Sequence, residues 1–100
     1  MDTSIKPITV DIIKNSLRID GDLDNDMIQR YITFSENYVK DAVNSDLTLD
    51  ILRKESVYNQ AVCLFTEYLY QQRGIVSDKP TNKPFEIVSC IQQLQGKYSN

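Results

Sequence analysis

Hydrophobic residues recur at intervals of three and four positions over most of this chain, a spacing that predicts helices rather than strands. The longest such segment covers residues 27–43, where apolar and polar side chains separate onto opposite halves of a helix with about 100° between successive residues. Its apolar half consists of Met27, Ile28, Tyr31, Ile32, Phe34, Tyr38, Val39, Ala42 and Val43. Ser35 also lies in this half, and we expect its hydroxyl to bond back to a carbonyl of the preceding turn.

A shorter helix is predicted ahead of this segment, beginning at Val10 and stopped by the Asp20-Gly21 pair. Thr9 is a favourable N-cap, because its hydroxyl can accept a hydrogen bond from an N–H group left unpaired in the first turn. Ile8 can pack on Ile13 as a hydrophobic staple that fixes the entry of the chain into the helix.

The turn between these two helices is acidic, and Asp22 or Asp24 can cap the long helix. Asp20, Asp22 and Asp24 also occupy the first, third and fifth positions of an EF-hand-like loop. The sixth position of such a loop needs glycine and here is Asn25, and the twelfth needs a bidentate glutamate and here is Tyr31. We therefore assign these carboxylates to capping and predict no metal site.

A third helix is predicted over about residues 53–73, after a linking stretch that begins at Asn44-Ser45-Asp46. Apolar residues surround nearly its whole circumference, so it must be covered nearly all round. Its apolar residues are Val57, Tyr58, Ala61, Val62, Cys63, Leu64, Phe65, Tyr68, Leu69 and Tyr70. The cover comes either from the other helices of the same chain or in part from a neighbouring subunit.

Gly74 closes the third helix, residues 75–83 form a loop, and Pro84 occupies the first turn of a fourth helix that ends before Gly96. No stretch alternates apolar and polar residues long enough to predict a strand, although Ile75-Val76 could pair briefly. We therefore predict an all-α fold, a compact bundle of four helices in the order short, long, long, short. Residues 1–100 are expected to form one domain, ordered over about residues 5–96.

Composition places the chain among soluble globular proteins, since 41% of its 100 residues are hydrophobic and 25% are charged. No apolar run is longer than Ala61–Phe65, and the first six residues lack the basic-then-apolar layout of a signal peptide. These features predict a protein that is made in a cytoplasm and does not associate with a membrane.

The charged and reactive residues argue against several classes of function. The net charge is −3 and the lysines and arginines are scattered, which is unfavourable for gripping a phosphate backbone. The chain has no histidine, so the commonest general base and the usual completion of a zinc site are missing. Cys63 and Cys90 are expected to be buried and reduced. We predict no enzymatic activity, no cofactor and no metal.

Several short segments follow one another in an order that suggests a family. Ile8-Thr9-Val10 opens the first helix, and Leu17-Arg18-Ile19-Asp20 ends it. The acidic turn and a long helix carrying an Ile and Tyr series follow. Tyr70-Gln71-Gln72-Arg73 ends the third helix, and a short helix follows Pro84. In this order the segments resemble the head-tail connector, or adaptor, proteins of long-tailed bacteriophages.

That resemblance implies a structural virion protein located in the neck of the particle and present in the bacterial cytoplasm during assembly. It implies a ring of about a dozen subunits, which requires two different faces of each subunit to meet. The ring would lie beneath the portal of the capsid and bind the next neck or tail component. DNA would pass through it without specific binding, and an acidic chain is compatible with a conduit that repels the duplex.

The aromatic residues of the third helix are the candidates for contacts between subunits. Tyr58, Phe65 and Tyr70 are proposed for this interface, and each has the alternative role of a core residue. The loop at residues 75–83 is expected to be mobile in the free subunit and to become ordered on assembly.

Two other functions remain open at this point. A small helical DNA-binding or regulatory domain would need a basic recognition helix, whereas the exposed surfaces expected here carry acidic residues among the basic ones. These acidic residues are Glu36, Asp41, Glu55 and Glu67. A general interaction module is the second alternative.

Overall fold

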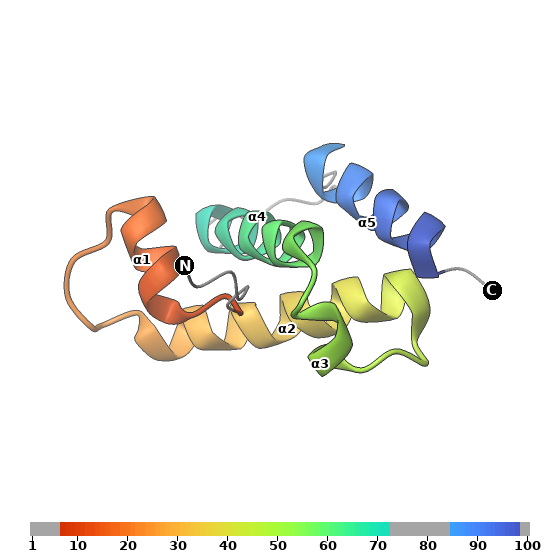
Figure 1. Cartoon of the computed structure of the whole chain (residues 1–100). Coiled ribbons are helices and arrows are strands. Elements are labelled where there is room, and N and C mark those ends of the chain that lie inside the picture. Colours follow the sequence, from red (N-terminus) through yellow and green to blue (C-terminus); the bar gives the residue numbers. More distant parts are fainter. Residues whose placement is uncertain (1–6, 73–84, 99–100) are drawn as a thin grey trace, which may run out of the picture.

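The computed structural model describes residues 7–72 and 85–98, and within these ranges it contains five helices and no strand (Figure 1). The helices are α1 (Val10–Leu17), α2 (Asn25–Asn44), α3 (Leu49–Leu52), α4 (Ser56–Gln72) and α5 (Phe85–Tyr98). The prediction of an all-α bundle is confirmed. The predicted loop at residues 75–83, together with Gly74 and Pro84, lies outside the described residues.

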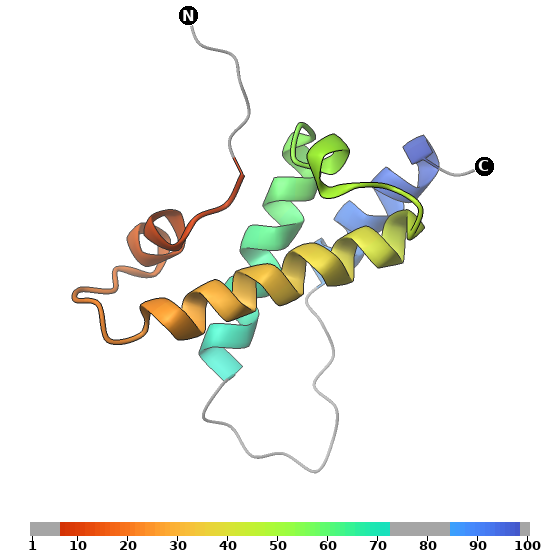
Figure 2. The same ribbon diagram turned by 90° about the horizontal axis from the view of Figure 1, so that it is seen from below.

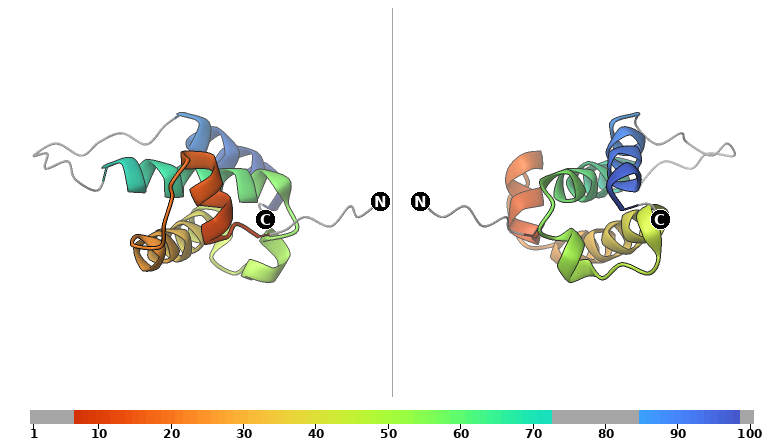
Figure 3. Two further views of the ribbon diagram at one scale, coloured as in Figure 1. Left: turned by 90° about the vertical axis from the view of Figure 1, so that its left-hand side faces the viewer. Right: turned by 45° about the vertical axis from the view of Figure 1, so that its right-hand side comes forward.

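The helices pack in two layers. α4 and α5 form one layer, α2 and α3 form the other, and α1 stands across one end against both α2 and α4 (Figures 1 and 3). Viewed from below, α2 crosses α4 obliquely, and α5 packs on both of them on the side away from α1 (Figure 2). The body measures 42 × 39 × 20 Å, and its smallest dimension equals about two helix diameters.

The core lies where these layers meet, and it draws residues from every helix. Its buried members are Ile13, Ile28, Ile32, Val39, Val43, Leu52, Tyr58, Ala61, Val62, Phe65, Ile87, Ile91 and Leu94. Ile8 is half-buried against this cluster, on the side of the chain entry into α1. Because α1, α2 and α5 all pack on α4, a single chain provides much of the cover that the apolar circumference of α4 requires.

α1 begins where the sequence indicates and ends earlier than expected. Thr9 has an extended backbone, and its Oγ1 accepts a hydrogen bond from the N–H of Ile12 at 3.3 Å. The last helical residue is Leu17, so the Asp20-Gly21 pair does not terminate this helix. Gly21 instead adopts φ 84° in the turn that follows, a conformation that favours glycine.

Arg18 ends α1 in the left-handed region, with φ 58° and ψ 45°. The N–H of Ile19 donates to the carbonyl of Lys14 at 2.9 Å, and the N–H of Arg18 donates to the carbonyl of Asn15 at 3.4 Å. This pair of bonds is the Schellman motif, formed here with arginine where glycine is usual. The early stop was missed because a non-glycine residue in this conformation leaves no signal in the sequence.

The linking stretch between the two long helices contains the one-turn helix α3, which the sequence pattern did not predict. Thr48 caps it by accepting a hydrogen bond from the N–H of Ile51 at 3.3 Å, and Leu52 is completely buried in the core. Consequently α4 begins at Ser56 rather than near residue 53.

α5 continues through Gly96, so the prediction that this glycine lies beyond the end of the helix is wrong. The carboxylate of Glu55 accepts hydrogen bonds from Lys97 Nζ at 2.7 Å and from the Tyr98 hydroxyl at 2.8 Å. These contacts hold the last turn of α5 against the start of α4 and outweigh the weak helix propensity of one glycine.

A buried polar pair joins the two long helices. The hydroxyl of Thr66 donates to the hydroxyl of Ser35 at 3.2 Å, and both side chains are completely buried. Ser35 therefore has a partner on α4, where the sequence led us to expect a bond within α2. Such a contact satisfies hydroxyl groups that would be costly to bury alone.

Candidate assembly surfaces

Two of the three residues proposed for subunit contacts lie in the core of the single chain. Tyr58 is completely buried, and its hydroxyl donates to the backbone carbonyl of Glu36 at 2.8 Å. Phe65 is 3% exposed, and its ring packs edge-on to the rings of Tyr38 and Phe34 with centroids 5.0 and 5.9 Å away. In this conformation neither side chain presents a surface to a neighbouring subunit, because α2 already covers it.

Tyr70, the third proposed interface residue, is half-buried near the end of α4. Its hydroxyl forms a short hydrogen bond with the carboxylate of Asp24. This contact ties the end of α4 to the start of α2. Tyr58, Phe65 and Tyr70 therefore do not form one surface, and Tyr70 has a bracing contact within its own chain.

The two proposed acidic caps act differently from the prediction. Asp24 stands at the N-cap position of α2, but its side chain makes no capping hydrogen bond and binds Tyr70. Asp22 accepts hydrogen bonds from Lys14 Nζ at 3.0 Å and from the Asn25 side chain at 3.3 Å. The hydrogen bond from Lys14 lowers the pKa of Asp22. Both carboxylates brace the turn between α1 and α2, because side chains from α1 and α4 lie within their reach.

The exposed apolar residues form a different set from the one proposed. Within the part of the chain that the structure describes, the exposed large hydrophobic side chains are Ile12, Leu23, Phe34, Ile51, Phe85 and Val88. Phe34 was placed on the apolar half of α2, yet it is 54% exposed, although its ring also contacts the ring of Phe65. Leu23 is fully exposed at the turn between α1 and α2. In the sequence, this exposure is suggested only by the position of Leu23 among four aspartates.

An apolar groove lies between the first half of α2 and the end of α4. It has a volume of about 650 Å³ and is lined by Gln29, Arg30, Tyr31, Thr33, Phe34 and Leu69. Rings and aliphatic groups make up most of its surface, with Arg30 as its charged residue among the lining side chains described. A groove of this kind suits an apolar side chain from another protein, since it offers area to bury and few groups to desolvate.

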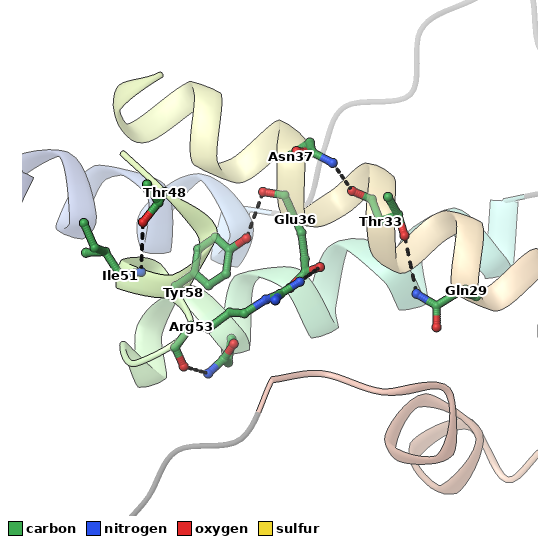
Figure 4. Close-up of polar contacts among 9 residues, drawn as sticks. Gln29, Thr33, Glu36, Asn37, Thr48, Ile51, Arg53 and Tyr58 are labelled. Carbon is green, nitrogen blue, oxygen red and sulfur yellow. Dashed lines mark hydrogen bonds and ion pairs between the residues drawn. The ribbon is translucent and has the colours of Figure 1, made fainter. Parts of the chain in front are cut away.

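A polar cluster between α2 and the α3–α4 connection has a structural role. The carboxylate of Glu36 pairs with the guanidinium of Arg53, and Asn59 Nδ2 donates to the carbonyl of Arg53 at 3.0 Å (Figure 4). The hydrogen bond to Glu36 raises the pKa of Arg53, and burial raises the pKa of Tyr58. The ion pair and the hydrogen bonds from Asn59 Nδ2 and the Tyr58 hydroxyl fix the α3–α4 connection and the start of α4 to one another and to α2.

The described residues do not bring together a set of metal ligands. Over residues 7–72 and 85–98, no three His, Cys, Asp or Glu side chains gather to hold a metal ion. Cys63 and Cys90 are free thiols, each half-buried, and burial raises the pKa of Cys63 to about 11. No helix in the described part of the chain has the length and hydropathy needed to cross a bilayer.

A family model described as phage gp6-like head-tail connector protein matches residues 7–94. The chain belongs to the phage gp6-like head-tail connector family. The matched range contains α1 to α4 in full and most of α5, so the connector similarity covers most of the packed body rather than one motif. The resemblance seen in the sequence is thereby confirmed, and it assigns the chain to structural components of phage particles. Searches of curated proteins and of solved structures found no match.

Proposed function

We propose that this connector chain assembles into a ring that joins the portal of the capsid to the neck or tail and lets DNA pass. The family match over residues 7–94 is the observation that carries this proposal. In this assignment the protein resides in the neck of the virion and is assembled in the bacterial cytoplasm. Its partners are further copies of itself, the portal protein and the next neck or tail component.

The surface of the bundle supports assembly with other chains. Among residues 7–72 and 85–98, six large hydrophobic side chains are exposed on a body only 20 Å thick. They lie on α1, α2, α3 and α5 and on the turn before α2, so several faces are available. A closed ring needs two different faces of each subunit, and further contacts above and below the ring need others.

The charge of the chain supports passage of DNA in preference to its capture. The net charge is −3, and the lysines and arginines are scattered along the sequence. Proteins that hold duplex DNA neutralise phosphates with clustered lysine and arginine. A chain of this charge favours a duplex that slides through without being bound.

The proposal is tested by coexpressing the chain with the portal protein encoded by the same phage genome and imaging the purified complex by electron cryomicroscopy. We expect a closed ring of this chain on the tail-proximal face of the portal, coaxial with its channel. Absence of the chain from both the portal complex and the neck of DNA-filled particles would contradict the proposal.

An electrophoretic mobility assay at low salt separates this proposal from the DNA-binding alternative. Short duplex DNA should not be retarded by the purified chain, because its net charge is −3 and its lysines and arginines are scattered along the sequence. Retardation that weakens steeply with added salt would favour the DNA-binding function instead.

A further inference from the structure

Leu23 has the features of a side chain presented for docking. It is fully exposed in the turn between α1 and α2, and that turn is held from two sides. Asp22 is paired with Lys14 at 3.0 Å, and Asp24 accepts the hydroxyl of Tyr70. A leucine carried on such a braced turn loses little conformational freedom when it binds, which lowers the cost of association.

The groove between α2 and α4 has the size and chemistry to receive an apolar side chain. Its volume of about 650 Å³ exceeds that of a leucine, and Tyr31, Phe34 and Leu69 give it apolar walls. The ring of Phe34 lies 5.9 Å from the ring of the buried Phe65, so this wall rests on the core. The chain does not fill the groove with its own Leu23, which is completely exposed to solvent.

The charges around the two features are complementary. Residues 20–26 place four aspartates around Leu23, whereas the described residues that line the groove include Arg30 and no carboxylate. Opposite charge at the edge of an apolar contact speeds encounter and fixes its orientation. This complementarity favours a second copy of the chain as the occupant over an unrelated partner.

We infer that Leu23 of one copy docks in the α2–α4 groove of the next copy, with Arg30 facing the aspartates of the incoming turn. This inference rests on the proposed function, because assembly into a ring supplies the second copy. Figure 2 shows the acidic turn projecting at one end of α2, while the groove lies further along that helix, beside the end of α4. The two patches share no residue, as a head-to-tail contact requires.

The contact is tested by sedimentation equilibrium and by ¹H–¹⁵N spectra of the 11.5 kDa chain, from micromolar to millimolar concentration. We expect the wild-type chain to associate and its Tyr31, Phe34 and Leu69 amide signals to shift with concentration.

Leu23→Ser should weaken the association at least about tenfold, the loss expected from removing one buried leucine side chain. Arg30→Glu, at an exposed position, should weaken it as well. Gln92→Asp, on the exposed side of α5, is the matched control and should associate as the wild type does.

A mixing experiment gives the contact its direction. Leu23→Asp removes the docking side chain and leaves the groove, whereas Phe34→Asp damages the groove and leaves Leu23. Neither variant should associate alone, but an equimolar mixture should form a heterodimer, because one intact Leu23 and one intact groove then meet. Circular dichroism melting of each variant establishes that it is folded before mixing.

Two results would overturn the inference. One is a Leu23→Ser chain that associates as tightly as the wild type, and the other is a wild-type chain whose groove signals do not move at millimolar concentration. If either occurs while the chain still forms a ring on the portal, the proposed function stands and only this contact is wrong. If the chain also fails to bind the portal, both are wrong.

Discussion

Arg53 and Glu36 form a bidentate ion pair between the α3–α4 connection and the middle of α2. Arg53 Nε lies 2.8 Å from Glu36 Oε2, and Nη2 lies 2.8 Å from Oε1. The Glu36 side chain is 7% exposed and that of Arg53 is 36% exposed, so the carboxylate is buried beneath its partner. A planar guanidinium matches both carboxylate oxygens at once, which fixes the direction in which the chain enters α4.

The first prediction concerns the loss of this pair. Arg53→Met should destabilise the protein by about 2 kcal/mol, because it leaves the Glu36 carboxylate buried without its partner. The double variant Glu36→Met with Arg53→Met should recover most of that loss, since it removes the buried charge as well. Urea unfolding followed by circular dichroism measures both values. A double variant no more stable than Arg53→Met would show that packing, not the unpaired charge, causes the loss.

A second prediction follows from the left-handed conformation of Arg18. Arg18→Gly should stabilise the protein by about 0.5–1 kcal/mol, because glycine adopts φ 58° without the steric cost that a Cβ imposes there. Arg18→Ala is the matched control, and it should be near neutral, since alanine keeps the strain and removes only an exposed side chain. If Arg18→Gly and Arg18→Ala changed the stability equally, the change would come from loss of the guanidinium and not from relief of backbone strain.

The amphipathic periodicity predicted the long helices well, because burial of one apolar face is what holds such helices in place. Residues 27–43 fall within α2 as observed, and Thr9 is the N-cap of α1. The sequence pattern did not predict the short helix between the two long ones. α3 is a single turn of four residues, and its burial through Leu52 depends on packing with a distant segment.

Contacts between distant residues decide features that the sequence alone could not show. Gly96 was expected beyond a helix end, but Glu55 holds the following turn of α5 in place. Tyrosine is common both in protein cores and in interfaces, so the residue type alone does not decide the role of Tyr58. The three-dimensional fold shows that α2 supplies its hydroxyl with a hydrogen-bond partner. The acidic turn and Leu23 were visible in the sequence, but the exposure of Leu23 became evident only from the structure.

A third prediction uses the position of Gly96 inside α5. A Cβ built at this glycine meets no atom within 4 Å, so alanine fits without strain. Gly96→Ala should stabilise the protein by about 0.5 kcal/mol, less than the full helix-propensity difference because the last turn frays. Thermal melting measures the change. Destabilisation would contradict the prediction.

The fourth prediction concerns the reactivity of Cys63. Burial, together with the charge of Glu67, raises the pKa of its thiol to about 11, so at pH 8 its thiolate fraction should be about a hundredfold below that of a thiol with a pKa of 9. In a Cys90→Ser background, the rate of alkylation should still rise with pH up to pH 10 without reaching a plateau. A plateau near pH 9 would contradict the raised pKa, since limited access alone lowers the rate at every pH without moving the midpoint.

Glu55 joins the start of α4 to the end of α5 through a single carboxylate oxygen. Its Oε1 accepts from Lys97 Nζ at 2.7 Å and from the Tyr98 hydroxyl at 2.8 Å. The hydrogen bond from Lys97 is the main cause that lowers the pKa of Glu55, and the bond from Tyr98 adds to it. The same contact raises the pKa of Lys97.

This arrangement predicts how stability depends on pH. Because the pKa of Glu55 is lower in the folded chain than its ordinary value of 4.5, its contribution is complete above that value and is lost as the pH falls through the folded pKa. Glu55→Gln keeps an acceptor for Tyr98 and removes the charge. The wild type should therefore be more stable than Glu55→Gln at neutral pH by a margin that stays constant down to about pH 5 and then shrinks. Urea unfolding at a series of pH values measures this margin, and a margin that does not change between pH 7 and pH 3 would contradict the prediction.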